Sequence, residues 1–186
     1  MVVTPSFYIT LQHEDEFIRH FATCRETSTM RMLAYNIPSC TGSEIPLACL
    51  RKMARKNWLS GFKESSGSKI YFKNALKISK EYEFNIFQGN ESDISWSLSN
   101  GANGIVPVCA NFSPELYVDA WRNRGSSKRL TQLQSKIDDN KAKYVIGDGT
   151  KSWLSGIVRE TSYRLELDCT MAHPLSNCSK SVMAGV

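Results

Sequence analysis

The sequence predicts an α/β protein built around a parallel β-sheet. Short apolar segments alternate with longer segments whose apolar residues recur every three or four positions, as on one face of a helix. The alternation repeats at intervals of about 20 to 30 residues, which is typical of strand–helix–strand units. Of the 186 residues, 41% are hydrophobic and 22% are charged, a globular composition that excludes disorder of the whole chain.

Five short segments have the apolar content and the flanking turn residues of β-strands. Asn, Ser or Gly follows most of them, and these residues favour the turns at which strands end. The expected strands are residues 2–3, 30–35, 59–63, 84–87 and 104–108.

Amphipathic helices are expected between these strands. Ser43 is the predicted N-cap of one helix, with Pro46 in its first turn, and Ser113 with Pro114 is the predicted start of a later one. The expected apolar faces are Phe17, Phe21 and Cys24; Ile45, Ala48, Cys49 and Met53; Phe72, Ala75, Leu76 and Ser79; Ile94 and Leu98; and Leu116, Ala120 and Trp121.

The strand pattern stops after Gly125, and the rest of the chain is predicted to be helical. Residues 126–145 and 150–164 have helical patterns, and Gly147-Asp148-Gly149 separates them. A last helix is expected near residues 179–183.

Several function classes are disfavoured by the same sequence. No segment approaches the roughly 20 apolar residues of a membrane-spanning helix, and residues 1–5 lack the basic and apolar regions of a signal peptide. We therefore expect a cytoplasmic protein without membrane contact. The net charge of +5 is compatible with nucleic acid or an anionic substrate. The basic residues of segment 51–56 surround a helical pattern, which favours a solvated helix face over a nucleic-acid site.

The cysteines and histidines predict no metal site. None of the six cysteines forms a C-x-x-C pair, and His13, His20 and His173 do not lie beside cysteines at zinc-finger spacing. A chain of this length needs no disulfide framework, so most cysteines are interpreted as small buried apolar side chains.

A parallel sheet can be open or closed into a barrel, and three motifs of open-sheet enzymes are absent. The chain has no dinucleotide fingerprint G-x-G-x-x-G, no phosphate loop G-x-x-x-x-G-K-[ST] and no nucleophile elbow G-x-S-x-G. The most common functions of open sheets are therefore disfavoured.

Lys63 is the strongest candidate for chemistry, because it ends an otherwise apolar predicted strand. A lysine among apolar walls loses hydration of its ammonium form, so its pKa falls and the neutral amine becomes a nucleophile. Tyr35 ends the preceding strand, and adjacent parallel strands lie about 4.8 Å apart. If both side chains point inward, the phenol can relay protons for the amine. The alternatives are an exposed lysine at the rim of the sheet and a structural tyrosine.

Two motifs contain these residues: YNIPSCTG at residues 35–42 and GFKESSG at residues 61–67. They resemble the two signature segments of the dihydrodipicolinate synthase / N-acetylneuraminate lyase family. Five further segments resemble the family in the same order, so that the similarity covers nearly all of the chain. These segments are residues 4–8, 89–91, 101–106, 111–115 and 149–157.

The resemblance implies an α/β fold that is a partial TIM (β/α)8 barrel, from about strand four to strand eight, plus a C-terminal helical bundle. The barrel part is then residues 1–125, and the helical region is residues 126–186. A full barrel takes about 250 residues. The first three strands, and the family's Thr-Thr segment that completes the pyruvate-carboxylate site, are therefore expected to be missing.

The resemblance also implies catalytic roles. Lys63 would form a Schiff base with pyruvate, and Tyr35 would be the proton relay. Tyr8 would reach across a dimer interface into the neighbouring site, with Phe7 as the alternative match. No metal and no organic cofactor is implied, because the iminium supplies the electron sink.

Six residues are expected to bind the substrate. Gly61 would leave room beside the lysine, Val106 would line the pyruvate pocket, and the matched segments place Thr41 and Gly89 at the same site. Cys40 stands where dihydrodipicolinate synthases usually carry an arginine, and a thiol cannot make that bidentate contact with a carboxylate. Glu91, followed by Ser, differs from the acidic pair of sialate lyases. The half-reaction that these families share, iminium formation with a 2-keto acid, is what the resemblance supports.

The expected function is that of a lyase or aldolase similar to 4-hydroxy-tetrahydrodipicolinate synthase. Its partners would be pyruvate or a related 2-keto acid, an aldehyde, and further copies of the chain in a dimer or tetramer. The alternative is a catalytically impaired barrel that acts only as an assembly partner or is a relic, so the activity of the chain itself is left open. A nucleic-acid binder, suggested only by the net charge, would lose affinity steeply with salt.

Overall fold

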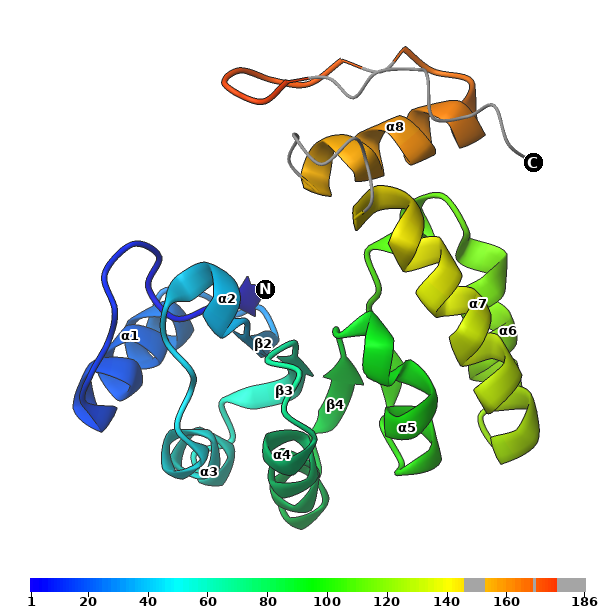
Figure 1. The fold of residues 1–186 in the computed structure, drawn as a ribbon. Helices are drawn as coiled ribbons and strands as arrows, with labels where there is room; N and C mark the ends of the chain where they lie inside the picture. The colour runs from blue at the N-terminus through cyan, green and yellow to red at the C-terminus, as the bar shows by residue number, and fades with distance from the viewer. Residues whose placement is uncertain (146–152, 169, 177–186) are drawn as a thin grey trace. The chain divides into compact units, whose positions relative to one another are not determined.

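Five parallel strands form one sheet in the order β1-β2-β3-β4-β5 (Figure 1). The computed structural model describes residues 1–145, 153–168 and 170–176. A helical crossover connects each strand to the next, because parallel neighbours cannot be joined by a tight hairpin. The predicted α/β class with a parallel sheet is thus confirmed. The strands are β1 (Val2–Val3), β2 (Met32–Asn36), β3 (Leu59–Glu64), β4 (Asn85–Gln88) and β5 (Gly104–Ile105).

The last strand is shorter than its apolar sequence predicts. Residues 104–108 were expected to form one strand, but β5 ends at Ile105. Val106 still donates its backbone N–H to the carbonyl oxygen of Gln88 at 2.8 Å, but Pro107 has no N–H with which to continue the ladder.

Helices occupy the connections, and α3, α4 and α5 lie along one side of the sheet in Figure 1. The α-helices are α1 (Glu14–Glu26), α2 (Pro38–Thr41), α3 (Leu47–Arg55), α4 (Lys69–Glu81), α5 (Ile94–Ser99), α6 (Pro114–Arg122), α7 (Ser127–Val145) and α8 (Trp153–Leu165). Two 3₁₀ helices are η1 (Glu91–Asp93) and η2 (Cys109–Asn111).

Of the two predicted helix starts, the one at Ser43 was wrong and the one at Ser113 with Pro114 is confirmed. The helix α3 begins after Pro46, and the Ser43 hydroxyl instead accepts a hydrogen bond from the backbone N–H of Leu11 at 2.8 Å. Ser113 does precede α6, but its side chain makes no capping hydrogen bond. Ser68 does cap a helix with its side chain, because its hydroxyl accepts a hydrogen bond from the N–H of Tyr71 at the start of α4.

The two faces of the sheet are buried to different degrees, since successive residues of a strand point to opposite faces. Ala34, Phe62 and Ile86 are fully buried in a hydrophobic cluster with helical side chains such as Phe72. The opposite face has no such cover from the described residues of this unit. Its residues are only half-buried: Leu33, Tyr35, Lys63 and Phe87.

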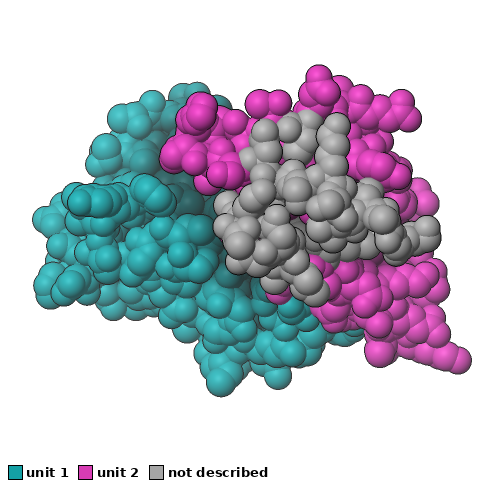
Figure 2. Space-filling model, turned by 45° about the horizontal axis from the view of Figure 1, so that its top comes forward, with its two compact units in different colours: residues 1–106 teal, residues 107–186 magenta. Residues whose placement is uncertain are grey.

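The chain divides into two compact units, residues 1–106 and 107–186, coloured separately in Figure 2. The first unit contains the whole sheet. In the second, α7 packs against α6 and α8, and Leu130, Leu133 and Ile137 on α7 are buried. The expected division into barrel residues 1–125 and helical residues 126–186 remains a prediction.

The predicted helices at 126–145 and 150–164 correspond to α7 and α8, although α8 is described only from Trp153. The glycine-rich separator 147–149 and the helix expected near 179–183 lie outside the described residues. In the part of the chain that the structure describes, no helix has both the length and the apolar character needed to cross a membrane.

Replacement of Phe62 by alanine should lower the free energy of unfolding by about 3–5 kcal/mol, because the fully buried ring would leave a cavity in the sheet–helix core. Denaturant unfolding followed by circular dichroism measures this change. Ile70→Ala is the matched control, since Ile70 is 76% exposed, and it should change the free energy by less than about 0.5 kcal/mol. Equal losses in the two variants would contradict the assignment of the core.

Candidate functional site

The parallel register brings Tyr35 and Lys63 together. Tyr35 on β2 is paired with Lys63 on β3, and Lys63 is paired with Phe87 on β4. The Nζ atom of Lys63 lies 4.1 Å from the centre of the Tyr35 ring. The two candidate catalytic residues are therefore neighbours at the carboxyl ends of adjacent strands. On a parallel sheet this is the end where active sites are built.

A serine contacts the phenol of this pair. Ser65 follows β3 directly, and its hydroxyl donates to the Tyr35 hydroxyl oxygen at 3.4 Å, a long hydrogen bond. The hydroxyl of Ser65, the phenol of Tyr35 and the amine of Lys63 thus lie next to one another at the end of β3. Ser65 was not predicted to be a site residue. Its place two residues after Lys63, on the same side of the extended chain, was the available signal.

Gly89 determines the space available to the lysine. A Cβ atom at Gly89 would lie 2.8 Å from Cε of Lys63 and 2.0 Å from Oγ of Ser65. Gly61, which was expected to leave room beside the lysine, lies one row earlier. The nearest atoms there belong to Leu33 at 3.0 Å and Phe87 at 3.1 Å. Gly89 is therefore the glycine whose missing side chain makes room for Lys63.

The other expected substrate contacts have varied environments. Thr41 is buried, and its hydroxyl donates within its own turn, to the carbonyl oxygens of Ile37 and Ser43. Cys40 is an exposed free cysteine. Glu91 is 4% exposed in η1, whereas Val106 is 43% exposed. Their binding roles remain predictions.

The environment of Tyr8 differs from that of these residues. It is 92% exposed in the loop after β1, and its φ of 74° is in the left-handed region that a tyrosine rarely adopts. Phe7, the alternative match, is 75% exposed. The role of Tyr8 in a neighbouring site remains a prediction.

A second row of side chains, on the helix-covered face, ends the same three strands. Asn36, Glu64 and Gln88 are paired in register and are all at most 2% exposed. The side-chain oxygen of each residue accepts a hydrogen bond from a backbone N–H of the segment that follows its strand. The donors are Ile45 to Asn36 at 2.9 Å, Ser66 to Glu64 at 2.8 Å and Asn90 to Gln88 at 2.9 Å. This polar row, which was not predicted from the sequence, ties the loops that follow β2, β3 and β4 to the ends of these strands.

Glu64 is the ionisable member of the polar row. Burial raises the pKa of its carboxyl above the ordinary value, and the hydrogen bonds from Ser66 and Asn36 oppose that rise. The nearby Glu44 raises the pKa further. The same burial raises the pKa of Tyr71 strongly, and the Tyr71 hydroxyl donates to the carbonyl oxygen of Ile45 at 2.6 Å.

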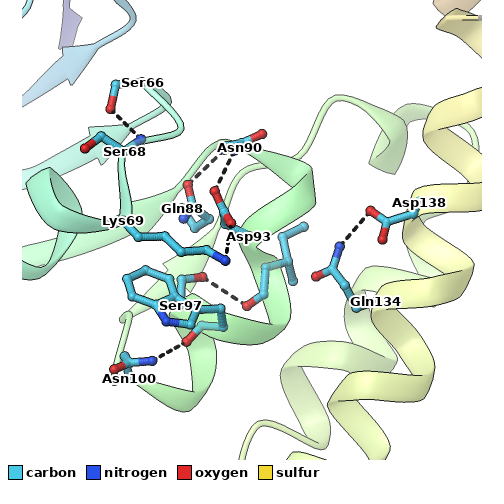
Figure 3. Close-up of polar contacts among 12 residues, drawn as sticks. Ser66, Ser68, Lys69, Gln88, Asn90, Asp93, Ser97, Asn100, Gln134 and Asp138 are labelled. Atoms are coloured by element: carbon cyan, nitrogen blue, oxygen red, sulfur yellow. Dashed lines mark hydrogen bonds and ion pairs between the residues drawn. The ribbon is translucent and has the colours of Figure 1, made fainter.

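Asp93 of η1 ties the first residue of α4 to the loop after β4 (Figure 3). The Lys69 ammonium lies 3.2 Å from one Asp93 oxygen, and the Asn90 side-chain amide donates to the other at 2.7 Å. Asp93 is largely buried, whereas Lys69 is about half exposed. Because Gly89 lies between Gln88 and Asn90, this contact helps to hold Gly89 beside Lys63.

No group of three His, Cys, Asp or Glu side chains within residues 1–145, 153–168 and 170–176 is arranged to hold a metal ion. The groups that the described residues bring to the site are an amine, a phenol, a hydroxyl and amides. Of these, an amine beside a phenol on an open face of a sheet is suited to condensation with a carbonyl compound.

Comparison with known proteins shows the family to which the chain belongs. Residues 1–149 match the dihydrodipicolinate synthetase family. An uncharacterized DapA-like lyase of Thermoplasma acidophilum is 33% identical over 152 residues, which cover 80% of this chain and 51% of that protein. The chain thus spans about half the length of this curated relative.

Solved structures show the same fold. The dihydrodipicolinate synthase of Bacteroides thetaiotaomicron superimposes with a TM-score of 0.86 and 25% identity, over 96% of this chain and 61% of that one. YagE, a prophage protein from E. coli K12 solved in complex with pyruvate, gives a TM-score of 0.84 at 18% identity, over 96% and 61% of the two chains. The sheet and its helices therefore match part of a dihydrodipicolinate synthase TIM barrel. The chain belongs to the dihydrodipicolinate synthetase family.

The buried carboxyl of Glu64 should make stability depend on pH. Since its pKa is raised in the folded state, the unfolded chain loses this proton first as the pH rises above about 4. The contribution of Glu64 to stability is then present at low pH and is lost as the pH rises through the interval between the unfolded and folded pKa. Glu64→Gln has no such proton. Its melting temperature relative to the original protein should therefore be higher at pH 8 than at pH 4. A constant difference in calorimetry would contradict the raised pKa.

Gly89→Ala should push the Lys63 side chain away from Tyr35, because the new methyl group would overlap Cε of Lys63. Reductive methylation with ¹³C-formaldehyde gives lysine methyl signals, and those of Lys63 should be shifted upfield by the Tyr35 ring. Lys63→Arg assigns the signal. The shift should be lost in Gly89→Ala and kept in Gly125→Ala, where no atom lies within 4 Å of the added Cβ. Retention of the shift in Gly89→Ala would disprove the steric role.

Proposed function

We propose that the chain carries the Schiff-base half of a pyruvate aldolase or lyase site, with Lys63 as the residue that bonds the substrate. The observation that carries the proposal is the pairing of Tyr35 with Lys63, with the amine 4.1 Å from the phenol ring. Formation and hydrolysis of an iminium require at least an amine and a neighbouring group that transfers protons.

The proposed reaction begins when the neutral amine of Lys63 attacks the keto carbon of pyruvate or a related 2-keto acid. The resulting carbinolamine takes up a proton and loses water, which leaves a C=N⁺ bond. The iminium then draws electrons from the neighbouring methyl carbon, and loss of a proton there gives an enamine. The enamine carbon bonds to the carbonyl carbon of an aldehyde, and water finally releases Lys63. Aldol cleavage runs these steps in reverse.

Tyr35 is the proposed proton carrier for these steps. Its phenol is adjacent to the amine, and its hydroxyl oxygen accepts from Ser65, so that Ser65 orients it. Gly89 keeps the space in which the amine swings toward the substrate. The choice of a 2-keto acid follows the family and the pyruvate bound by YagE. Cys40, Thr41, Glu91 and Val106 are the proposed contacts of the substrates. The identity of the aldehyde is left open, because Cys40 offers no guanidinium for a second carboxylate.

We also propose the larger assembly in which this site would act. The five strands correspond to strands four to eight of a TIM barrel, and the helices from residue 126 form the C-terminal bundle. Such a barrel would act as a homo-oligomer in which Tyr8 reaches the neighbouring site. The high exposure of Tyr8 supports this arrangement, because a side chain that reaches across an interface must leave its own unit.

The second candidate function is an assembly partner without activity. It is favoured by the open face of the sheet, the face without helical cover, where the apolar side chains of Leu33 and Phe87 are only partly buried. In this sheet β1 and β5 are edge strands, and a closed barrel has no edge. The two candidates differ in one respect: only the first requires a covalent bond between Lys63 and a keto acid.

Borohydride reduction in the presence of pyruvate should attach one reduced pyruvyl group to the protein, at Lys63. Hydride adds to the iminium carbon and leaves a stable secondary amine, which peptide mass spectrometry locates. Lys63→Ala should abolish the label, and Lys77→Ala, which removes an exposed lysine of α4, should leave it unchanged. Tyr35→Phe should slow labelling on the order of a hundredfold, as expected for loss of a general acid–base.

Folding is checked on the same samples by circular dichroism, and oligomeric state by gel filtration. A folded protein that takes no label at Lys63 would overturn the aldolase proposal. An oligomer without label would favour the assembly partner.

A further inference from the structure

The carboxyl of Glu64 is buried directly behind the candidate site and is not used by the proposed reaction. It is 1% exposed, although an ionisable group is rarely buried without a function or a partner. Its Oε1 atom accepts two hydrogen bonds, from the Asn36 side-chain amide at 3.0 Å and from the backbone N–H of Ser66 at 2.8 Å. One oxygen therefore connects the end of β2 with the turn that leaves β3.

The two connected points are the immediate neighbours of the reactive pair. Tyr35 is paired with Lys63, and the next residues along the two strands, Asn36 and Glu64, are also paired. Because side chains alternate between the faces, the first pair lies on the open face and the second lies on the helix-covered face. The Asn36–Glu64 hydrogen bond thus fixes the two backbones one residue beyond Tyr35 and Lys63.

The second hydrogen bond acts on the turn. Ser66 follows Ser65, whose hydroxyl donates to the Tyr35 oxygen. By holding the N–H of Ser66, Glu64 fixes the direction in which Ser65 leaves the strand. The connection continues through Asn36, whose side-chain oxygen accepts the N–H of Ile45 at 2.9 Å. All three residues of the candidate site, Tyr35, Lys63 and Ser65, are therefore adjacent in sequence to members of one buried network.

We propose that Glu64 is a positioning residue for the Lys63 amine: its Oε1 atom locks the ends of β2 and β3 and the Ser65–Ser66 turn so that the amine stays against the Tyr35 ring. The inference rests on the proposed Schiff-base function for its consequence in catalysis. A small displacement of a reacting group lowers rates steeply, so a lock placed next to the amine affects the reaction more than its effect on folding would suggest.

Two substitutions of Glu64 distinguish the effect of its hydrogen-bond acceptor from the effect of its charge. Both hydrogen bonds end on a single oxygen, so Glu64→Gln keeps an acceptor for both donors. Glu64→Leu fills similar space without an acceptor and leaves the N–H groups of Asn36 and Ser66 without this partner. Asn36→Ala removes only the cross-strand donor, and it serves if the leucine variant does not fold.

The control is Tyr71→Phe, which removes a buried hydrogen bond to the carbonyl oxygen of Ile45 but leaves both hydrogen bonds of the Glu64 Oε1 atom in place. It reports what a comparable loss of stability does to Lys63 when the proposed lock is intact. Circular dichroism and thermal unfolding establish that each variant is folded at the temperature of the experiment.

The first readout is the ring-current shift of the ¹³C-methylated Lys63 signal in the full chain, which needs no pyruvate. Glu64→Gln and Tyr71→Phe should keep the upfield shift, whereas Glu64→Leu and Asn36→Ala should lose most of it. The second readout is the rate of borohydride trapping at saturating pyruvate. It should fall on the order of tenfold or more in Glu64→Leu and Asn36→Ala, and should return to near the original value in Glu64→Gln.

Each outcome decides one question. If folded Glu64→Leu and Asn36→Ala keep the Lys63 shift, or if Tyr71→Phe loses it equally, the positioning role is wrong. If Glu64→Gln loses the shift, the single-oxygen lock is wrong. If the shifts follow the expectation but the original protein takes no pyruvate label, the proposed function fails, while the structural role of Glu64 stands.

Discussion

The parallel register between β2 and β3 is the constraint on which the candidate site depends. It pairs Tyr35 with Lys63 on the open face and Asn36 with Glu64 on the covered face. A slip by one residue would exchange the two faces, so that the amine would enter the hydrophobic core and the carboxyl would leave it. The hydrogen bond between Asn36 and Glu64 and the complete burial of Ala34 and Phe62 both select the observed register. The arrangement of the site is thus inseparable from the packing of the core behind it.

Much of the fold could be predicted because it follows from periodicity. The strands and the main helices have distinct apolar patterns, and the motifs around Tyr35 and Lys63 identified the pair that the register brings together. The failures depend on single hydrogen bonds between distant segments. Ser43 has the sequence of a cap, but its hydroxyl binds the N–H of Leu11, 32 positions away, in a competition that local sequence cannot reveal. The expected strand 104–108 was too long for a different, local reason: Pro107 lacks the backbone N–H that would continue the ladder.

The polar row Asn36, Glu64 and Gln88 was missed for a related reason. A polar residue at the end of an apolar strand resembles an ordinary strand end in sequence, and only the folded structure shows that these side chains are buried on the helix-covered face. The role of Gly89 could not be predicted for a similar reason. It depends on the close approach of Cε of Lys63, which belongs to another strand. The family match places the chain among dihydrodipicolinate synthase relatives, yet residues such as Cys40 differ from the usual pattern. Membership in the family and choice of substrate are therefore separate questions.

The unequal burial of the two faces of the sheet has a consequence for how such a protein can change. The side chains that hold the strands to their helices, such as Phe62 and Ile86, all lie on one face, and the candidate reactive groups lie on the other. Most substitutions on the reactive face leave the hydrophobic core intact, so new side chains can be tried there with little loss of folded protein. A scaffold with this separation can acquire new chemistries over evolutionary time while its architecture stays recognisable, as the differing substrates of proteins that share this fold illustrate.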